Sequence, residues 1–289
     1  MKLIECPRDA IQGLPHFVPT SVKINYLNAL LKVGFHTLDF GSFVSPKVIP
    51  QMRDTAEVLA GLDLSTTSTH LLAIVASVSG AKIAMRYPEI RYLGFPLSVS
   101  ETFQLRNTNK TIAQAIEVVK EIQNMCLQHH KELVIYFSMG FGNHYGDPYD
   151  ENILGEMTFK MNAIGIKTIA LADTIGISNP ENIRRAFQTL IPAFPHIEFG
   201  AHLHSHPRTA MRKIAAAWQA GCRRFDGALR GFGGCPIAKD ELTGNIATEA
   251  MIEYFERENI PTGINTQALS QALQLSVEVF DSQLPNYPV

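Results

Sequence analysis

The chain has 289 residues, which is enough for one large barrel or two ordinary domains. Its apolar fraction of 46% and charged fraction of 18% are those of a soluble protein with a sizeable hydrophobic core. The formal net charge of -2 gives no reason to expect nucleic acid or an anionic membrane as a partner.

The amino terminus passes directly into a short apolar segment, without the apolar stretch and cleavage site of a secretion signal. No uncharged run approaches the ~20 residues that a membrane helix needs. The cysteines show neither CxxC pairs nor the spacing of a disulfide framework. The sequence therefore predicts a cytoplasmic protein with free thiols at Cys6, Cys126, Cys222 and Cys235.

Short segments rich in β-branched residues alternate with longer segments of helical character along the whole chain. The short segments are almost wholly apolar, as expected of strands that are buried on both faces. They predict eight strands, at Lys2–Glu5, His36–Phe40, Leu71–Ala76, Ile90–Phe95, Leu133–Phe137, Lys167–Leu171, Ile197–Ala201 and Arg223–Ala228.

A helical segment follows each predicted strand. The first helix is predicted over about Ser21–Val33, and the second is predicted to begin near Pro46. The clearest helix comes after the fourth strand, because apolar residues there recur every three or four positions. These residues are Ile112, Ile116, Val119, Ile122 and Met125.

Eight β/α units without a linker favour one α/β domain, a (β/α)8 TIM barrel. We expect the barrel to span residues 1–265 and a short helical C-terminal extension to span residues 266–289. A doubly wound open sheet is the alternative, but such sheets usually stop at about five or six strands. The segment Cys6–Asp9 after the first strand is also not a GxGxxG fingerprint.

Candidate metal ligands follow three of the predicted strands, where the active sites of TIM barrels lie. Alternate residues of a strand face the same side, so the imidazoles of His202 and His204 are expected to meet. Asp9 offers an anionic oxygen, and Asn245 offers an amide oxygen. Hydrogen-bonded histidines, a turn-capping Asp9 and a helix-capping Asn245 are the alternatives. Imidazoles favour transition ions whereas oxygen ligands suit magnesium or manganese, so ligand chemistry leaves the metal open.

Other reactive side chains are placed at the same end of the barrel. Arg8 is expected either to stabilise an oxyanion or to form a structural ion pair. Cys235 lies in the glycine-rich segment Gly231–Pro236 and is either an acid/base group or a small buried residue. Asp39 is a further catalytic candidate near the end of the second strand.

The remaining candidates are expected to contact substrate or to support the ligands. Asp173 is predicted to orient a histidine from behind, or to cap its own loop. The long polar loop after the fifth strand is typical of a substrate-binding loop. Candidate substrate contacts are Gln12, Ser42, Asn143 and Thr174, and Glu249 is a second candidate for supporting the ligands.

Six segments, in this order, resemble the DRE-TIM metallolyase superfamily and, within it, the 3-hydroxy-3-methylglutaryl-CoA (HMG-CoA) lyase family. The similarity covers about residues 3–265. The segments are Pro7–Gln12, Ser42–Lys47, Leu171–Gly176, His202–His204, Gly231–Pro236 and Gly244–Glu249.

The resemblance implies a role for each of the main candidates. Arg8 would stabilise an enolate, and Cys235 would take part in proton transfer. The implied reaction is cleavage of HMG-CoA to acetyl-CoA and acetoacetate, as in leucine degradation and ketone-body formation. An acyl-CoA would be the ligand, and a homodimer is one expectation because the family often forms them. Mg²⁺ or Mn²⁺ would be held by Asp9, His202, His204 and Asn245.

Three positions depart from the family pattern. Asp39 stands where the family has a glutamate, so we expect either a pocket closed around the shorter acid or a bulkier substrate. Ser205–Pro207 replaces the acid or asparagine that usually follows the histidines. Gly13–His16 lacks the acidic and lysine residues common in these lyases.

Two other functions compete with the lyase. One is a synthase of the same superfamily, of the 2-isopropylmalate, citramalate or homocitrate type, which condenses acetyl-CoA with a 2-keto acid. Such synthases commonly carry a further C-terminal domain, whereas only residues 266–289 follow the predicted barrel, and the Gly-Gly-Cys-Pro loop is typical of the lyases. The other is a catalytically silent barrel that binds a metal or a partner, suggested by the changes at Asp39 and Ser205.

Overall fold

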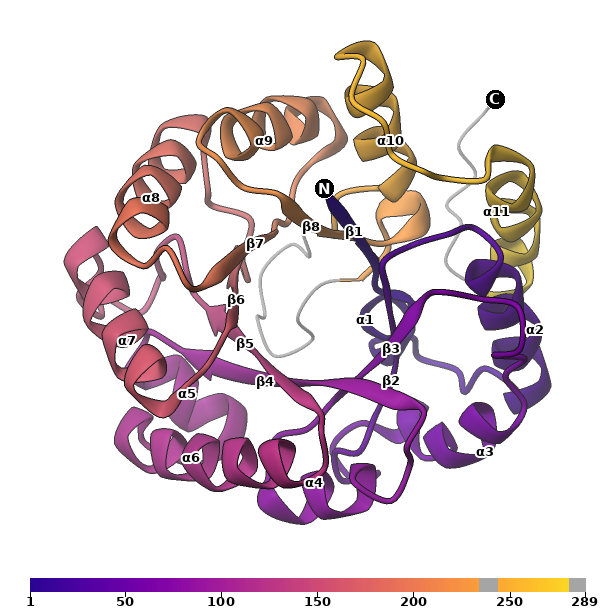
Figure 1. The fold of residues 1–289 in the computed structure, drawn as a ribbon, viewed down its shortest axis with the longest axis horizontal. Coiled ribbons are helices and arrows are strands. Elements are labelled where there is room, and N and C mark those ends of the chain that lie inside the picture. The colour runs from indigo at the N-terminus through magenta and orange to yellow at the C-terminus, as the bar shows by residue number, and fades with distance from the viewer. Residues whose placement is uncertain (234–243, 281–289) are drawn as a thin grey trace.

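Eight parallel strands form a closed barrel in sequence order, and helices surround it (Figure 1). The computed structural model describes residues 1–233 and 244–280. β8 pairs with β1 and closes the barrel, so the predicted TIM barrel is confirmed. The strands are β1 (Lys2–Glu5), β2 (Thr37–Ser42), β3 (His70–Ile74), β4 (Ile90–Ser98), β5 (Glu132–Ser138), β6 (Thr168–Ala172), β7 (Glu198–His202) and β8 (Arg224–Gly227).

The helices follow the prediction in part. The helices at the carboxyl ends of β1 and β4, α1 and α5, were not predicted because they are too short to show a period. The described helices are α1 (Pro7–Gln12), α2 (Thr20–Leu31), α3 (Thr55–Ala60), α4 (Val78–Ala84), α5 (Glu101–Thr108), α6 (Ile112–Gln128), α7 (Glu151–Ile164), α8 (Pro180–Ala193), α9 (Pro207–Gln219), α10 (Thr248–Arg257) and α11 (Thr266–Phe280), with 3₁₀ turns η1 (Pro50–Met52) and η2 (Leu229–Gly231).

The helix predicted to begin near Pro46 begins later. Ser45 starts a turn there, in which the N–H groups of Val48 and Ile49 donate to its carbonyl oxygen. Pro50 has no N–H and would break a helix that had started at residue 46. The chain therefore forms η1 at Pro50, and α3 follows only after Asp54.

The main core lies between the barrel and its helices. The predicted apolar face of α6 packs there, with Ile116, Val119 and Ile122 buried and Met125 partly buried. Thr111 fixes the start of this helix, since its side chain and that of Gln114 form a reciprocal capping box.

The interior of the barrel holds a buried cation. Arg224 of β8 is 1% exposed, and its Nε atom lies 3.8 Å from Oδ1 of Asp226 on the same strand. Gly200 of β7 pairs with Arg224 and leaves room for it, because a Cβ atom at position 200 would lie 2.9 Å from Cδ of the arginine. β7 thus needs a glycine where β8 places a long side chain inside the barrel.

The C-terminal helix α11 packs beside α2 on the outside of the barrel (Figure 1). The rings of Tyr26 and Phe280 meet edge to face at 6.2 Å, and Nε of Arg230 donates to Oγ of Ser276 at 2.6 Å. The division at residue 265 stays a prediction. Within residues 1–233 and 244–280, no helix combines the length and apolar character needed to cross a membrane.

Glu5 ties the first strand to the segment after the last. Its buried carboxylate accepts hydrogen bonds from the Leu229 N–H at 2.8 Å and from the Thr248 hydroxyl at 2.5 Å. Burial outweighs these bonds and raises the pKa of Glu5 from 4.5 to about 8. The folded protein therefore holds a proton that the unfolded chain has already released between these pH values.

We expect the free energy of unfolding to fall between about pH 5 and 8, by up to about 1.4 kcal/mol per pH unit. The stability is fully present below the unfolded pKa and is lost as the pH rises through the folded one. Glu5→Gln should flatten this part of the profile, because the amide cannot ionise. Urea unfolding of both proteins across this pH range measures the effect, and parallel profiles would contradict it.

Candidate active site

The turn from β1 into α1 places two charged side chains at the barrel mouth. Pro7 is at the start of α1, where its fixed φ angle and missing N–H suit the first helical turn. Arg8 and Asp9 follow and are both buried. Asp9 thus lies inside a short helix rather than in the turn that was its alternative assignment.

Asp9, His202 and His204 form a buried cluster. One ligand atom from each lies within 4.8 Å of the others, and the two imidazole centroids are 5.4 Å apart. His202 ends β7, and His204 follows it at the spacing that brings both rings together. Neither ring nitrogen of His204 has a hydrogen-bond partner among the described residues. Because buried polar atoms without partners are costly, this arrangement fits a bound cation.

Asn245 reaches the same cluster. It bridges to His204 through backbone pairing, and its Nδ2 atom donates to Oδ2 of Asp9 at 2.7 Å. Its Oδ1 atom has no partner within the described part of the chain, so an amide oxygen remains for a cation. The helix-capping alternative is wrong, because α10 begins at Thr248 and Ala247 precedes it.

Gly233 allows this close approach. A Cβ atom at position 233 would lie 2.4 Å from Nδ2 of Asn245 and 2.9 Å from Oδ2 of Asp9. The residue also has a φ angle of 110°, in the region that favours glycine. Any side chain at this position would push the two proposed ligands apart.

The protonation states of Asp9 and His204 are those of metal ligands. Burial alone would raise the pKa of Asp9, but Arg8 and the two histidines lower it to about 2. Burial and the neighbouring His202 lower the pKa of His204 to about 4. At neutral pH the cluster therefore offers a carboxylate and a neutral imidazole, which are the forms that bind cations.

Arg8 is held by three side chains. Its Nε and Nη2 atoms donate to the Asp39 carboxylate, at 3.0 Å and 2.6 Å for the closer oxygen. Its Nη1 atom donates to Oδ1 of Asp9 at 3.1 Å and to Oε1 of Gln12 at 2.9 Å. These bonds use four of the five N–H groups of a guanidinium. Nη2 makes a single hydrogen bond among residues 1–233 and 244–280, so it has a second N–H group to donate, and Arg8 lines the cavity described below.

Asp39 fixes the guanidinium in place. Its side chain is 1% exposed and lies within β2, which continues two residues beyond the predicted Phe40. Burial raises the pKa of Asp39 to about 6, although Arg8 opposes the shift. The two-pronged contact means that the aspartate reaches Arg8 without a gap. The structure therefore favours a pocket closed around the shorter acid over one that leaves empty space beside it.

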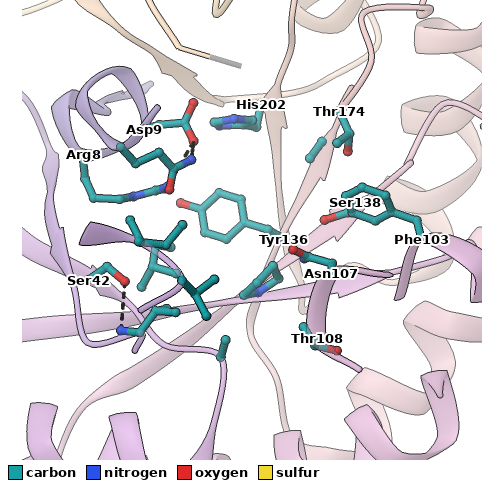
Figure 2. A pocket seen from close by; sticks show the side chains of 18 of the residues that line it. Arg8, Asp9, Ser42, Phe103, Asn107, Thr108, Tyr136, Ser138, Thr174 and His202 are labelled. Carbon is teal, nitrogen blue, oxygen red and sulfur yellow. Dashed lines mark hydrogen bonds and ion pairs between the residues drawn. The ribbon is translucent and has the colours of Figure 1, made fainter. Parts of the chain in front are cut away.

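A cavity of about 170 Å³ opens beside Arg8 and the histidines (Figure 2). Gln12, Ser42 and Thr174 line it, as proposed for substrate contacts. Its other wall comes partly from α5, through Phe103, Asn107 and Thr108. Tyr136 lies between these two sides in Figure 2. The remaining lining residues are Asp9, Val44, Val48, Ile49, Ile74, Ala76, Pro96, Ser138, Ala172, His202 and His204.

Two predicted site residues have other contacts, and a third cannot be placed. Asn143 organises its own loop, with Oδ1 accepting from the N–H groups of Tyr145 and Asp147, and it is not among the residues that line the cavity. The Glu249 carboxylate accepts from the Arg230 N–H. Cys235 lies outside the described residues.

Asp173 takes its alternative role as a loop cap. Its carboxylate accepts from Ser178 and, at 2.9 Å, from Nζ of Lys213. Lys213 also donates to the carbonyl oxygen of His204 at 2.7 Å. Asp173 therefore supports the backbone of a proposed ligand through a lysine, and its hydrogen bonds within the described chain go to Ser178 and Lys213.

Asp226 and Tyr136 were not predicted as part of the site. Oδ2 of Asp226 lies 3.4 Å from Nδ1 of His202, and the Tyr136 ring meets the His202 ring at 5.7 Å. Both residues lie within strands rather than after them. Asp226 could have been found because it is a charged residue within a strand of the barrel. In a strand buried on both faces, such a residue is expected to point into the barrel.

The fold and this cluster define a TIM-barrel protein with a metal-type ligand set at the carboxyl ends of its strands. The family model described as HMGL-like matches residues 3–275, and the chain belongs to that family. The resemblance drawn from the six segments is therefore confirmed.

Individual relatives agree with this family. The chain is 30% identical to the hydroxymethylglutaryl-CoA lyase YngG of Bacillus subtilis, over 97% of this chain and 93% of that protein. It is 29% identical to the (R)-citramalyl-CoA lyase of Chloroflexus aurantiacus, over 92% and 86%. A structure of an HMG-CoA lyase from Acinetobacter baumannii, in complex with coenzyme A and 3-methylmalate, matches with a TM-score of 0.89 at 30% identity, covering 100% of this chain and 96% of that one.

Proposed function

We propose that this enzyme is a divalent-metal-dependent lyase that cleaves HMG-CoA, or a close acyl-CoA analogue, to acetyl-CoA and a keto acid. The observation that carries the proposal is the position of Arg8. Its guanidinium contacts Asp9 of the histidine cluster, lines the cavity and keeps one N–H group for a substrate atom. A fixed cation at this point is suited to the negative charge that develops on a thioester oxygen.

The residues divide the reaction between them. Asp9, His202, His204 and Asn245 would hold Mg²⁺ or Mn²⁺, which supplies the positive charge that lowers the pKa of a neighbouring hydroxyl. When the tertiary hydroxyl gives its proton to solvent, the carbon that bears it becomes a ketone carbon and the adjacent C–C bond breaks. The bonding electron pair passes to the thioester enolate. The enolate oxygen accepts a hydrogen bond from the remaining N–H group of Arg8. Protonation of the enolate carbon then gives acetyl-CoA, and the resemblance assigns that proton transfer to Cys235.

The relatives support the acyl-CoA class and leave the exact substrate to experiment. One named relative is a hydroxymethylglutaryl-CoA lyase, another is an (R)-citramalyl-CoA lyase, and a third was solved with coenzyme A and 3-methylmalate. All three names describe lyases or their complexes, which favours cleavage over the condensing synthase.

The test is release of acetyl-CoA by purified protein loaded with Mg²⁺ or Mn²⁺. HMG-CoA and citramalyl-CoA are offered in parallel, and we expect acetoacetate as the second product from HMG-CoA. Release of free CoA from acetyl-CoA in the presence of a 2-keto acid would identify the synthase instead. Bound metal without turnover of any acyl-CoA would identify the silent barrel.

Lengthening the acid at position 39 tests how tightly Arg8 is positioned. Asp39→Glu adds one C–C bond, about 1.5 Å, to a carboxylate that already contacts Arg8 directly. The guanidinium must then move toward the cavity, and displacements of ~1 Å in positioning groups cost about 100-fold in rate. We expect kcat to fall by about that factor while metal content stays the same.

Elemental analysis beside steady-state kinetics decides this prediction. Equal or higher turnover in Asp39→Glu would mean that the site has room for the longer acid. A loss of turnover confined to larger acyl-CoA substrates would support the alternative in which Asp39 makes room for a bulkier substrate.

A further inference from the structure

His202 belongs to two buried groups of polar side chains. One is the proposed ligand cluster with Asp9 and His204, and the other contains Cys6 and Asp226. β7 and β8 pair His202 directly with Asp226, and Nδ1 of the imidazole lies 3.4 Å from Oδ2 of the carboxylate. The ring therefore has a carboxylate at Nδ1, which leaves Nε2 as its other donor or ligand atom.

The other oxygen of Asp226 lies near a buried cation, without a hydrogen bond to it among the described residues. This Oδ1 atom lies 3.8 Å from Nε of Arg224, the buried cation that Gly200 admits into the barrel. One oxygen thus faces a permanent positive charge while the other faces His202. Arg224 and Asp226 are each 1% exposed, so water does not screen this arrangement.

We propose that Asp226 is a positioning residue that fixes the tautomer of His202. A carboxylate accepts hydrogen bonds only, so Nδ1 must carry the proton and Nε2 keeps its lone pair for a cation. Carboxylates behind metal-bound histidines have this effect in other proteins and also fix the ring orientation. The inference rests on the metal site in the proposed function, but it assigns a role that the lyase chemistry does not require.

The second group has one other interpretation, a thiophilic cation bound by Cys6, His202 and Asp226. The positive charge of Arg224 next to Asp226 opposes a further cation there. The stoichiometry of binding separates the two, since positioning predicts one ion per chain.

The first measurement is Mn²⁺ affinity of the metal-free protein by calorimetry. In Asp226→Asn, Arg224 should attract the amide oxygen, so the NH₂ group turns toward His202 and forces its proton onto Nε2. We expect the dissociation constant for Mn²⁺ to rise about 10- to 100-fold. Glu5→Gln is the matched control, because it also replaces a buried acidic side chain with its amide on a neighbouring strand and should leave the constant unchanged.

The second measurement is the ¹⁵N spectrum of the imidazoles in the metal-free wild-type protein at mildly alkaline pH. His202→Gln identifies the signal of His202 among the 10 histidines. We expect the Nδ1–H tautomer for His202 and the Nε2–H tautomer after Asp226→Asn. A wild-type Nε2–H tautomer overturns the inference even if the variant fails to fold, as does an unchanged Mn²⁺ affinity in a folded variant.

These outcomes differ from failure of the proposed function. Wild-type protein that binds Mn²⁺ with the expected tautomer but cleaves no acyl-CoA would retain the role of Asp226 and reject the lyase. Wild-type protein that binds neither Mn²⁺ nor Mg²⁺ would reject the role of Asp226 and the metal dependence together.

Discussion

Asp9→Ala and His204→Ala should each remove the bound metal and abolish turnover. Each deletes one donor from a cluster whose ligand atoms lie within 4.8 Å of one another. Since changes behind the ligands already cost 10- to 100-fold in metal affinity, we expect loss of a ligand to weaken Mn²⁺ binding by more than about 100-fold. Turnover should fall by at least about 10³-fold at metal concentrations that saturate the wild type.

The two variants should differ in a second property. Asp9→Ala also removes the acceptor for Arg8 and Asn245, which makes it the more disruptive change. His204→Ala removes a ring whose nitrogens have no hydrogen-bond partner in the described chain, so it should lower the melting temperature less. Elemental analysis, kinetics and thermal unfolding together test this. Wild-type metal content in both variants would contradict the proposed ligand set.

Arg8→Gln should have the opposite signature, with metal retained and turnover lost. The proposed role of Arg8 is to receive enolate charge, and removing one donor of this kind typically costs 10²- to 10³-fold in kcat. We expect a loss of about 10³-fold, because a permanent charge is removed as well. Arg8→Lys should also fail, since an ammonium cannot reproduce the paired bonds from Nε to Oδ1 and from Nη2 to Oδ2 of Asp39.

Arg8→Gln leaves the buried Asp39 without its cation, so the fold needs a control. The double variant Arg8→Gln/Asp39→Asn removes both charges and should recover stability without recovering turnover. Metal loss in Arg8→Gln would show that the arginine organises the ligands rather than the enolate. Recovery of activity in the double variant would show that its contribution is structural.

The order of the barrel elements could be predicted because parallel strands carry a strong signal. Strands buried on both faces are continuously apolar, and their ends were placed within a few residues. The helix expected near Pro46 does not form, because Pro50 lacks the N–H that a helix begun at residue 46 would need. The short helix α1 has too few residues to show a period, although its start at Pro7 was readable.

The site could be predicted only where residues lie at strand ends. His202, His204 and Asp9 follow from that rule, and the structure brings them together. Asp226 could not be predicted, because its contact with His202 depends on the pairing of β7 with β8. The sequence of one strand does not reveal its neighbour. The contact between Asp173 and Lys213 was hidden for the same reason, since the lysine lies on the following helix.

The barrel joins the two ends of the chain, and this has a consequence for how the protein is made. The bond from Thr248 to Glu5 spans 243 residues, and that from Asn245 to Asp9 spans 236. During synthesis, β1 lacks its neighbour β8 until Gly227 has left the ribosome, and contacts of such long sequence separation form slowly. Because the proposed ligands come from both ends, metal binding during refolding should report ring closure itself, arriving later than the helical signal.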